Sequence, residues 1–164
     1  LRDIDSALKI NPRYALHYDQ RAIVYSEIAV KMNDNQLLDS ALRDSDKALS
    51  LNVHDEMSWY NRGLILTRLN NSKDKSKSFE EDILCYNEAI KINPKYKYAY
   101  HNRGASYRRN EEYETAIKDA ITAITLDKNY ALPYLTRGKC YRKLGKIELA
   151  QKDFAMFEKL NSKK

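Results

Sequence analysis

The sequence predicts an all-α protein built from stacked, antiparallel helix pairs, and two observations carry this prediction. First, one phrase occurs four times in the 164 residues: an aromatic residue, Arg three positions later, a small residue at four, and Tyr or Leu at seven. The copies begin at Tyr18, Trp59, Tyr100 and Tyr134. Second, each copy is followed by another amphipathic segment. Offsets of three, four and seven share one helix face, so each copy is interpreted as a pair of short helices.

The predicted helices follow one another in a regular order, separated by turn residues. Second helices are expected at residues 42–51, 83–92, 117–126 and 149–160, each with alanines that allow close packing. Each ends near Asn or Asp, and Asn93 is followed by Pro, which disfavours helical geometry at the residue before it. The repeats are therefore placed at residues 15–55, 56–96, 97–130 and 131–164. Residues 1–14 are interpreted as the second helix of a truncated leading repeat, so the chain is expected to be part of a longer protein.

Two of these repeats are longer than the others. The phrase recurs after 41, 41 and 34 residues, which predicts about seven extra residues between the helices of repeats 15–55 and 56–96. The extra residues lie near 29–35 and 70–76, and the second stretch is polar. A lengthened, solvated inter-helix loop is predicted in both repeats, with a functional loop tip as the alternative.

Residues 97–130 closely match a known pattern of repeated helix pairs. The matching residues are Ala99, Tyr100, Gly104, Tyr107, Tyr113, Ala116 and Ala123. This segment resembles the tetratricopeptide repeat family. The resemblance implies a right-handed superhelical α-solenoid of stacked antiparallel helix pairs, with the first helices lining a concave groove. Two departures matter: Asp82 stands where the family has Ala and puts the start of that helix in doubt, and Phe157 predicts that no further repeat packs tightly behind it.

Composition and charge restrict the functional classes. The chain carries 29 Lys and Arg against 23 Asp and Glu, a net charge of +6, with the basic excess concentrated in residues 131–164. No apolar run is long enough to span a bilayer, so a cytoplasmic protein is expected that does not bind a membrane. Cys85 and Cys140 are isolated and are expected to be buried. The three His residues have no partner set for catalysis or metal binding, so we expect a protein that is not an enzyme and uses no cofactor or metal.

The second face of each first helix supplies the candidate binding residues. Gln20, Asn61 and Asn102 recur at one register, where Thr136 stands in the last copy. A side-chain amide both donates and accepts, so it can pair with a peptide bond of any sequence. The alternative is that these amides satisfy neighbouring helix backbones.

The same faces become basic toward the end of the chain. The candidate residues are Arg68, Arg108, Arg109, Lys139, Arg142 and Lys143. Arg can form two parallel bonds with a carboxylate or phosphate, whereas Lys offers a point charge. We therefore expect an acidic or phosphorylated peptide segment across the last repeats. A lysine-rich solvated helix is the alternative.

Other partners receive less support from the sequence. The family's clamp for chaperone C-terminal tails uses a Lys, but the matching positions carry Asp19, Tyr60, His101 and Leu135. Chaperone tails are therefore not expected as partners. Self-assembly through the repeat ends and a regulatory repeat domain of a larger enzyme stay open. Nucleic-acid binding is disfavoured, because most of the 13 Tyr occupy packing positions of the repeat.

The Arg of the repeated phrase is expected to be structural. Arg21, Arg103 and Arg137 are matched at one register of the second helices by Asp44, Asp119 and Asp153, whereas Arg62 is matched by Cys85. An ion pair or helix cap between neighbouring helices is the favoured interpretation over ligand contact.

Overall fold

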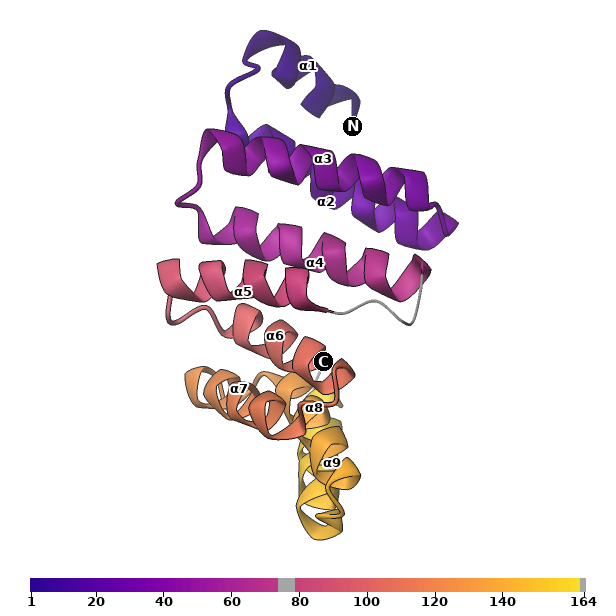
Figure 1. The fold of residues 1–164 in the computed structure, drawn as a ribbon, viewed down its shortest axis with the longest axis vertical. Helices are drawn as coiled ribbons and strands as arrows, with labels where there is room; N and C mark the ends of the chain where they lie inside the picture. Colours follow the sequence, from indigo (N-terminus) through magenta and orange to yellow (C-terminus); the bar gives the residue numbers. More distant parts are fainter. Residues whose placement is uncertain (74–78, 163–164) are drawn as a thin grey trace. The chain divides into compact units, whose positions relative to one another are not determined.

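The computed structural model describes residues 1–73 and 79–162, and every element in these ranges is an α-helix (Figure 1). The helices are α1 (Arg2–Ile10), α2 (Ala15–Met32), α3 (Asn35–Leu51), α4 (Glu56–Lys73), α5 (Glu80–Ile92), α6 (Lys97–Arg109), α7 (Tyr113–Leu126), α8 (Ala131–Lys143) and α9 (Ile147–Asn161). They form two compact units, which we call the N-terminal unit (Leu1–Asn93) and the C-terminal unit (Pro94–Lys164). The predicted all-α, helix-pair fold is confirmed.

The N-terminal unit packs α1 to α5. α2 packs on α1, on α3 and on α4, and α4 packs on α3 and on α5. Small residues make this approach possible: Ala22 and Ala29 of α2 and Ala41 of α3 are at most 1% exposed, and they meet Ile65 and Leu69 of α4 in one core cluster. The small alanines leave space that larger aliphatic side chains fill. This gives the dense packing that stacked helix pairs need, because each pair alone has too little core.

The C-terminal unit repeats this arrangement with shorter helices. α6 packs on α7 and α8, and α8 packs on α7 and α9. Gly104 allows the close approach within the first pair, since a Cβ there would lie 3.1 Å from the Asp119 Cβ and 3.2 Å from the Ala116 carbonyl oxygen. In the second pair Gly138 lies against the Phe154 ring, 2.8 Å from where a Cβ would stand. The glycine of the phrase is therefore a contact surface for the second helix.

The loop predicted within residues 29–35 is absent, because the extra residues are helical. α2 has 18 residues and α3 has 17, and only Asn33 and Asp34 separate them. Asn33 ends α2 in the left-handed conformation, with φ of 54°, and the Asp34 side chain caps α3 by accepting bonds from the backbone N–H groups of Gln36 and Leu37. The second predicted loop, 70–76, is helical as far as residue 73, and its remainder lies outside the described residues.

The ion-pair prediction for the repeated phrase is confirmed. Arg103 donates two bonds to Asp119, at 2.8 and 2.7 Å, and Arg137 forms the same pair with Asp153. Each Arg also lies between the two Tyr rings of its own phrase, as Arg103 does between Tyr100 and Tyr107. The phrase therefore specifies one local arrangement. The guanidinium lies between aromatic rings three positions before and four after it, and it forms an ion pair with an Asp of the second helix of its pair.

In the N-terminal unit the Arg of the phrase has a second side-chain partner. Arg21 pairs with Asp44 of α3 and also with Asp5 of α1, at 2.8 Å, so it joins the preceding helix to its own pair. Arg62, whose phrase has Trp and Leu in place of Tyr, donates to Asp46 of α3 at 2.7 Å and contacts the Cys85 Sγ at 3.1 Å. Both cysteines are buried and free, as expected.

Asp82, expected to weaken the start of its helix, lies in the first turn of α5. Its carboxylate is buried and accepts a bond of 2.6 Å from the Thr67 hydroxyl of α4. A buried carboxylate with a hydroxyl partner replaces the alanine of the repeat pattern without ending the helix.

Candidate binding surface

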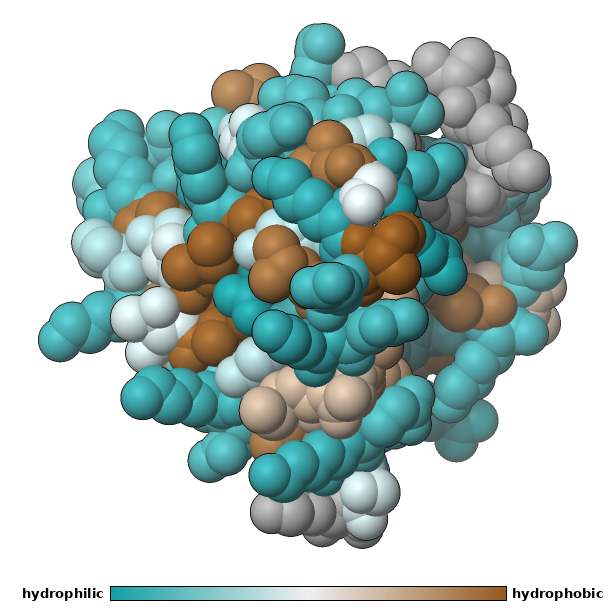
Figure 2. All heavy atoms as spheres, turned by 90° about the horizontal axis from the view of Figure 1, so that it is seen from below, coloured by the Kyte–Doolittle hydropathy of each residue, from teal (hydrophilic) through white to brown (hydrophobic). Residues whose placement is uncertain are grey.

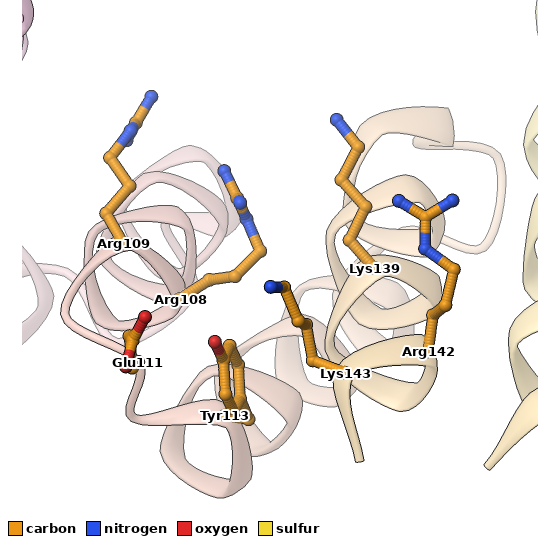
Figure 3. A pocket seen from close by; sticks show the side chains of 7 residues that line it. All are labelled: Arg108, Arg109, Glu111, Tyr113, Lys139, Arg142 and Lys143. Atoms are coloured by element: carbon orange, nitrogen blue, oxygen red, sulfur yellow. The ribbon is translucent and has the colours of Figure 1, made fainter. Parts of the chain in front are cut away.

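Five predicted site residues line one pocket of the C-terminal unit. Arg108 and Arg109 come from the last turn of α6, and Lys139, Arg142 and Lys143 from the second half of α8. Figure 3 shows the charged ends of Arg108, Arg109, Lys139 and Lys143 directed to the same side, above Tyr113. The pocket has a volume of about 240 Å³ and also includes Glu111 and Tyr113. We call it the basic pocket.

Helix geometry explains how the sequence assembles this pocket. Lys139, Arg142 and Lys143 are spaced by three and four residues, so they lie on one face of α8. α6 and α8 pack on each other, which brings the end of α6 beside that face. Basic residues at helix C-termini also interact favourably with the helix dipole, and this effect accounts for part of the charge there. The helix dipole does not explain why basic side chains of two different helices line the same pocket.

Cys140 and His101, which lie near Arg108 and Arg109 of the basic pocket, are uncharged at neutral pH. Arg108 is half-buried and its Nε atom has no hydrogen-bond partner among the described residues. Burial raises the pKa of the neighbouring Cys140 thiol to about 11, with the Arg108 charge acting in the opposite direction. Burial and the charge of Arg109 lower the pKa of His101 to about 4. At neutral pH the charge of this region therefore comes from its Arg and Lys side chains.

Apolar residues occupy the other end of the same helix faces. Tyr98 at the start of α6 is 41% exposed, and Leu132 at the start of α8 is 45% exposed. Positions seven and eleven residues later return to nearly the same side of a helix, so Tyr98 shares a face with Arg109, and Leu132 with Lys139 and Lys143. The face that α6 and α8 present is thus apolar at one end and basic at the other. Figure 2 shows hydrophobic residues in several small groups among hydrophilic ones over the face in view.

The predicted amide series does not form a uniform exposed row. Gln20 is exposed and Asn102 is half-buried, but Asn61 is only 5% exposed. Thr136, which takes the same register in the last repeat, is also buried. Asn61 therefore has little surface for contact with a peptide in this structure. Sequence register placed these residues at one position of the repeat but could not predict how deeply each of them is buried.

Arg68 belongs to the N-terminal unit, whereas the lining of the basic pocket comes from the C-terminal unit. Its guanidinium donates to the Ser26 hydroxyl, so it joins α4 to α2. Ser26 is buried and its own hydroxyl donates to the Ile23 carbonyl. The contact gives Arg68 a structural role between first helices, which the sequence alone did not predict.

A buried carboxylate in the N-terminal unit was also missed by the sequence analysis. Asp19 of α2 is 5% exposed and bonds to the Ser58 hydroxyl of α4, which lies 2.6 Å from a carboxylate oxygen of Asp55 as well. One serine hydroxyl has a single proton to donate, so it cannot satisfy both carboxylates. The other Asp19 oxygen, Oδ1, has no partner among the described residues. Burial, together with the charge of Asp55, raises the pKa of Asp19 to about 6, against the lowering effect of Ser58.

Asp19→Asn is expected to stabilise the protein at neutral pH. A pKa raised from 3.8 to about 6 means that Asp19 contributes stability that is fully present below pH 4 and is lost as the pH rises through about 6. The amide removes this loss, so the variant should gain on the order of 1–3 kcal/mol over the natural chain at pH 7.5 and nothing at pH 4. Urea unfolding at the two pH values measures the difference. Asp3→Asn, at an exposed position of α1, is the control, and an equal effect of Asp19→Asn at both pH values would contradict the expectation.

Neither a metal-binding group nor a membrane-spanning helix is present among the described residues. Over 1–73 and 79–162, His, Cys, Asp and Glu do not gather in groups of three that could hold a metal ion. No helix in the same ranges is long and apolar enough to cross a membrane.

Comparisons with known proteins agree with this geometry. A family model described as tetratricopeptide repeat matches residues 85–118. The crystal structure of MamA matches with a TM-score of 0.80 at 21% identity, covering 99% of this chain and 86% of that one. TTC0263, a tetratricopeptide repeat protein of Thermus thermophilus, matches with a TM-score of 0.74 at 18% identity, covering 96% and 79%. The second repeat domain of Spaghetti (RPAP3), bound to the HSP90 peptide SRMEEVD, gives 0.57 at 28% identity, covering 64% and 91%. A comparison with curated proteins finds no match.

Proposed function

We propose that this chain, whose residues 85–118 match a tetratricopeptide repeat model and whose fold is similar to that of MamA, is a non-catalytic interaction scaffold whose C-terminal unit binds an extended acidic peptide segment of a partner protein. One observation carries the proposal: five cationic side chains from two helices converge on the basic pocket, beside a single acidic residue. The Spaghetti domain supports the general mode, since it holds a peptide with three acidic residues on a similar fold.

The mode of capture differs from recognition of a chain terminus. Of the positions where the family's clamp places a Lys, the C-terminal unit has His101 and Leu135, and His101 is uncharged at neutral pH because its pKa is about 4. The cationic groups lie instead at the far ends of α6 and α8. We therefore expect internal acidic side chains to be bound, with little dependence on a free C-terminal carboxylate.

The binding experiment compares two variants of equal net charge. Arg109→Glu, Arg142→Glu and Lys143→Glu reverse three charges in the basic pocket, whereas Lys118→Glu, Lys128→Glu and Lys152→Glu reverse three charges elsewhere in the C-terminal unit. Each exposed contact contributes up to about 1 kcal/mol, so the loss of three should weaken binding of a fluorescent Glu- and Asp-rich decapeptide by about 30-fold. Fluorescence anisotropy gives the affinities, and thermal unfolding by circular dichroism checks that both variants fold.

The control variant should stay within about threefold of the natural chain, because long-range attraction alone is screened at physiological salt. Equal weakening of both variants would mean that net charge, and not the basic pocket, attracts the peptide. If the natural chain does not bind the decapeptide at all, the proposed function is wrong.

A further inference from the structure

We propose that the basic pocket is a subsite for a phosphate group, carried by a phosphorylated Ser or Thr within the bound peptide. This inference rests on the proposed function, because it names the group that the same surface prefers. Its ligand is a phosphopeptide that also places an apolar residue about five residues from the phosphate.

The charge of the basic pocket exceeds what one carboxylate can neutralise. Its lining holds five cationic side chains and one acidic one, Glu111. The C-termini of α6 and α8 each contribute about −0.5 charge, which leaves about +3. A carboxylate brings one negative charge, whereas a phosphate monoester brings about 1.5 to 2 at pH 7 and three strong acceptor oxygens. The phosphate matches this excess better within a hollow of about 240 Å³.

The donor geometry also suits a tetrahedral group. Arg108 and Arg109 approach from α6, and Lys139 and Lys143 from α8, so donors meet the hollow from two sides (Figure 3). A phosphate accepts bonds in several directions, whereas the oxygens of a carboxylate lie in one plane.

The face that leads to the basic pocket favours a peptide over other phosphate sources. Tyr98 and Leu132 are exposed apolar residues on the faces of α6 and α8 that end at Arg109 and Lys143. Each pair is separated by eleven helical residues, or about 16 Å. An extended peptide covers that distance in about five residues. A peptide with a phosphate at one end and an apolar side chain at the other would therefore use both ends of the surface.

The experiment uses the whole chain and four peptides of one acidic sequence. One has phosphoserine at its centre, one has Ser, and one has Glu. In the fourth, the phosphopeptide's Leu residues five positions before and after the centre are replaced by Ala. The phosphopeptide should bind at least about 10-fold more tightly than the Glu peptide, and loss of the Leu residues should weaken it about threefold or more. Isothermal titration calorimetry measures all four.

Two variants test where the phosphate binds. One variant combines Lys139→Gln with Lys143→Gln, and the other carries the Arg109, Arg142 and Lys143 charge reversals. Each variant should bind the phosphopeptide no more tightly than it binds the Glu peptide. The Lys118, Lys128 and Lys152 reversals should keep the preference of about 10-fold. Equal affinity of the natural chain for the phosphoserine and Glu peptides would overturn the phosphate inference and leave the acidic-peptide function intact. No binding of any peptide would overturn both.

Two further probes separate the sources of phosphate. Single-stranded RNA of about 20 nucleotides and vesicles with about 5% phosphatidylinositol bisphosphate should each bind less tightly than the phosphopeptide at physiological salt, because neither supplies the spaced apolar residue. Tighter binding of either probe, abolished by the pocket variants, would overturn the assignment to a phosphopeptide.

Discussion

Replacing Tyr86 with Ala is expected to destabilise the N-terminal unit by about 3–5 kcal/mol. The Tyr86 side chain is 0% exposed, and its ring lies against the Gly63 backbone, where a Cβ would come within 2.6 Å. Its hydroxyl is 3.0 Å from the Thr67 Oγ1. Removal of the ring leaves a cavity between α4 and α5, which helices packed through a glycine cannot close by small shifts. Urea unfolding followed by far-UV circular dichroism measures the loss.

Two matched variants make this prediction specific. Tyr86→Phe keeps the ring and loses only the hydroxyl, so it should cost about 1 kcal/mol. Tyr14→Ala removes the same atoms at a site that is 47% exposed and should cost less than about 1 kcal/mol. A Tyr86→Ala loss no larger than that of Tyr14→Ala would show that the α4 and α5 contact does not depend on this ring.

Asp119→Ala should strongly destabilise the C-terminal unit by breaking one of its two Arg–Asp pairs with the least exposed carboxylates. It leaves Arg103, whose side chain is 19% exposed, without the carboxylate that accepts two of its hydrogen bonds. Loss of one partner of a buried pair costs about 3–5 kcal/mol, and the partial exposure of Arg103 reduces the expected cost here to about 2–3 kcal/mol. Thermal and urea unfolding of the variant measure it.

A double-mutant cycle separates the charge effect from lost packing. Arg103→Met with Asp119→Leu replaces both charges by apolar groups of similar length, and the double variant should be more stable than the single Asp119→Leu variant. The exposed Lys91 and Glu88 pair gives the comparison, since Glu88→Ala should cost less than about 1 kcal/mol. Strictly additive effects of the Arg103 and Asp119 changes would mean that the pair contributes no interaction energy.

The sequence predicted the helix pairs and their internal bonds well, because both depend on local spacing. An Arg with Tyr three positions before and four after it defines one helix face, and the matching Asp recurs at a fixed register of the next helix. The same spacing located the five residues that line the basic pocket. These are properties of periodicity, which a single sequence contains.

The incorrect predictions concern how deeply side chains are buried and where helices end. Both depend on contacts with other helices. The stretch 29–35 was predicted as a loop, yet most of its residues continue α2, because nothing in the sequence before Asn33 stops a helix. Asn61 was predicted to face a groove, but it is only 5% exposed. The raised pKa of Asp19 comes mainly from its burial, which local spacing in the sequence does not show.

The added residues in the long helix pairs also suggest how such a chain can change its length. Arg21 meets Asp44 across 23 positions and Arg103 meets Asp119 across 16, a difference of seven, or nearly two helical turns. If each helix of the pair is lengthened by about one turn at the inter-helix end, the side chains that face the partner helix keep facing it. An insertion of about three or five residues would rotate one helix against the other and separate Arg from Asp. Variation in hairpin length should therefore occur in steps of about seven residues, each extending the tip by about 5 Å of new surface while the older contacts stay in register.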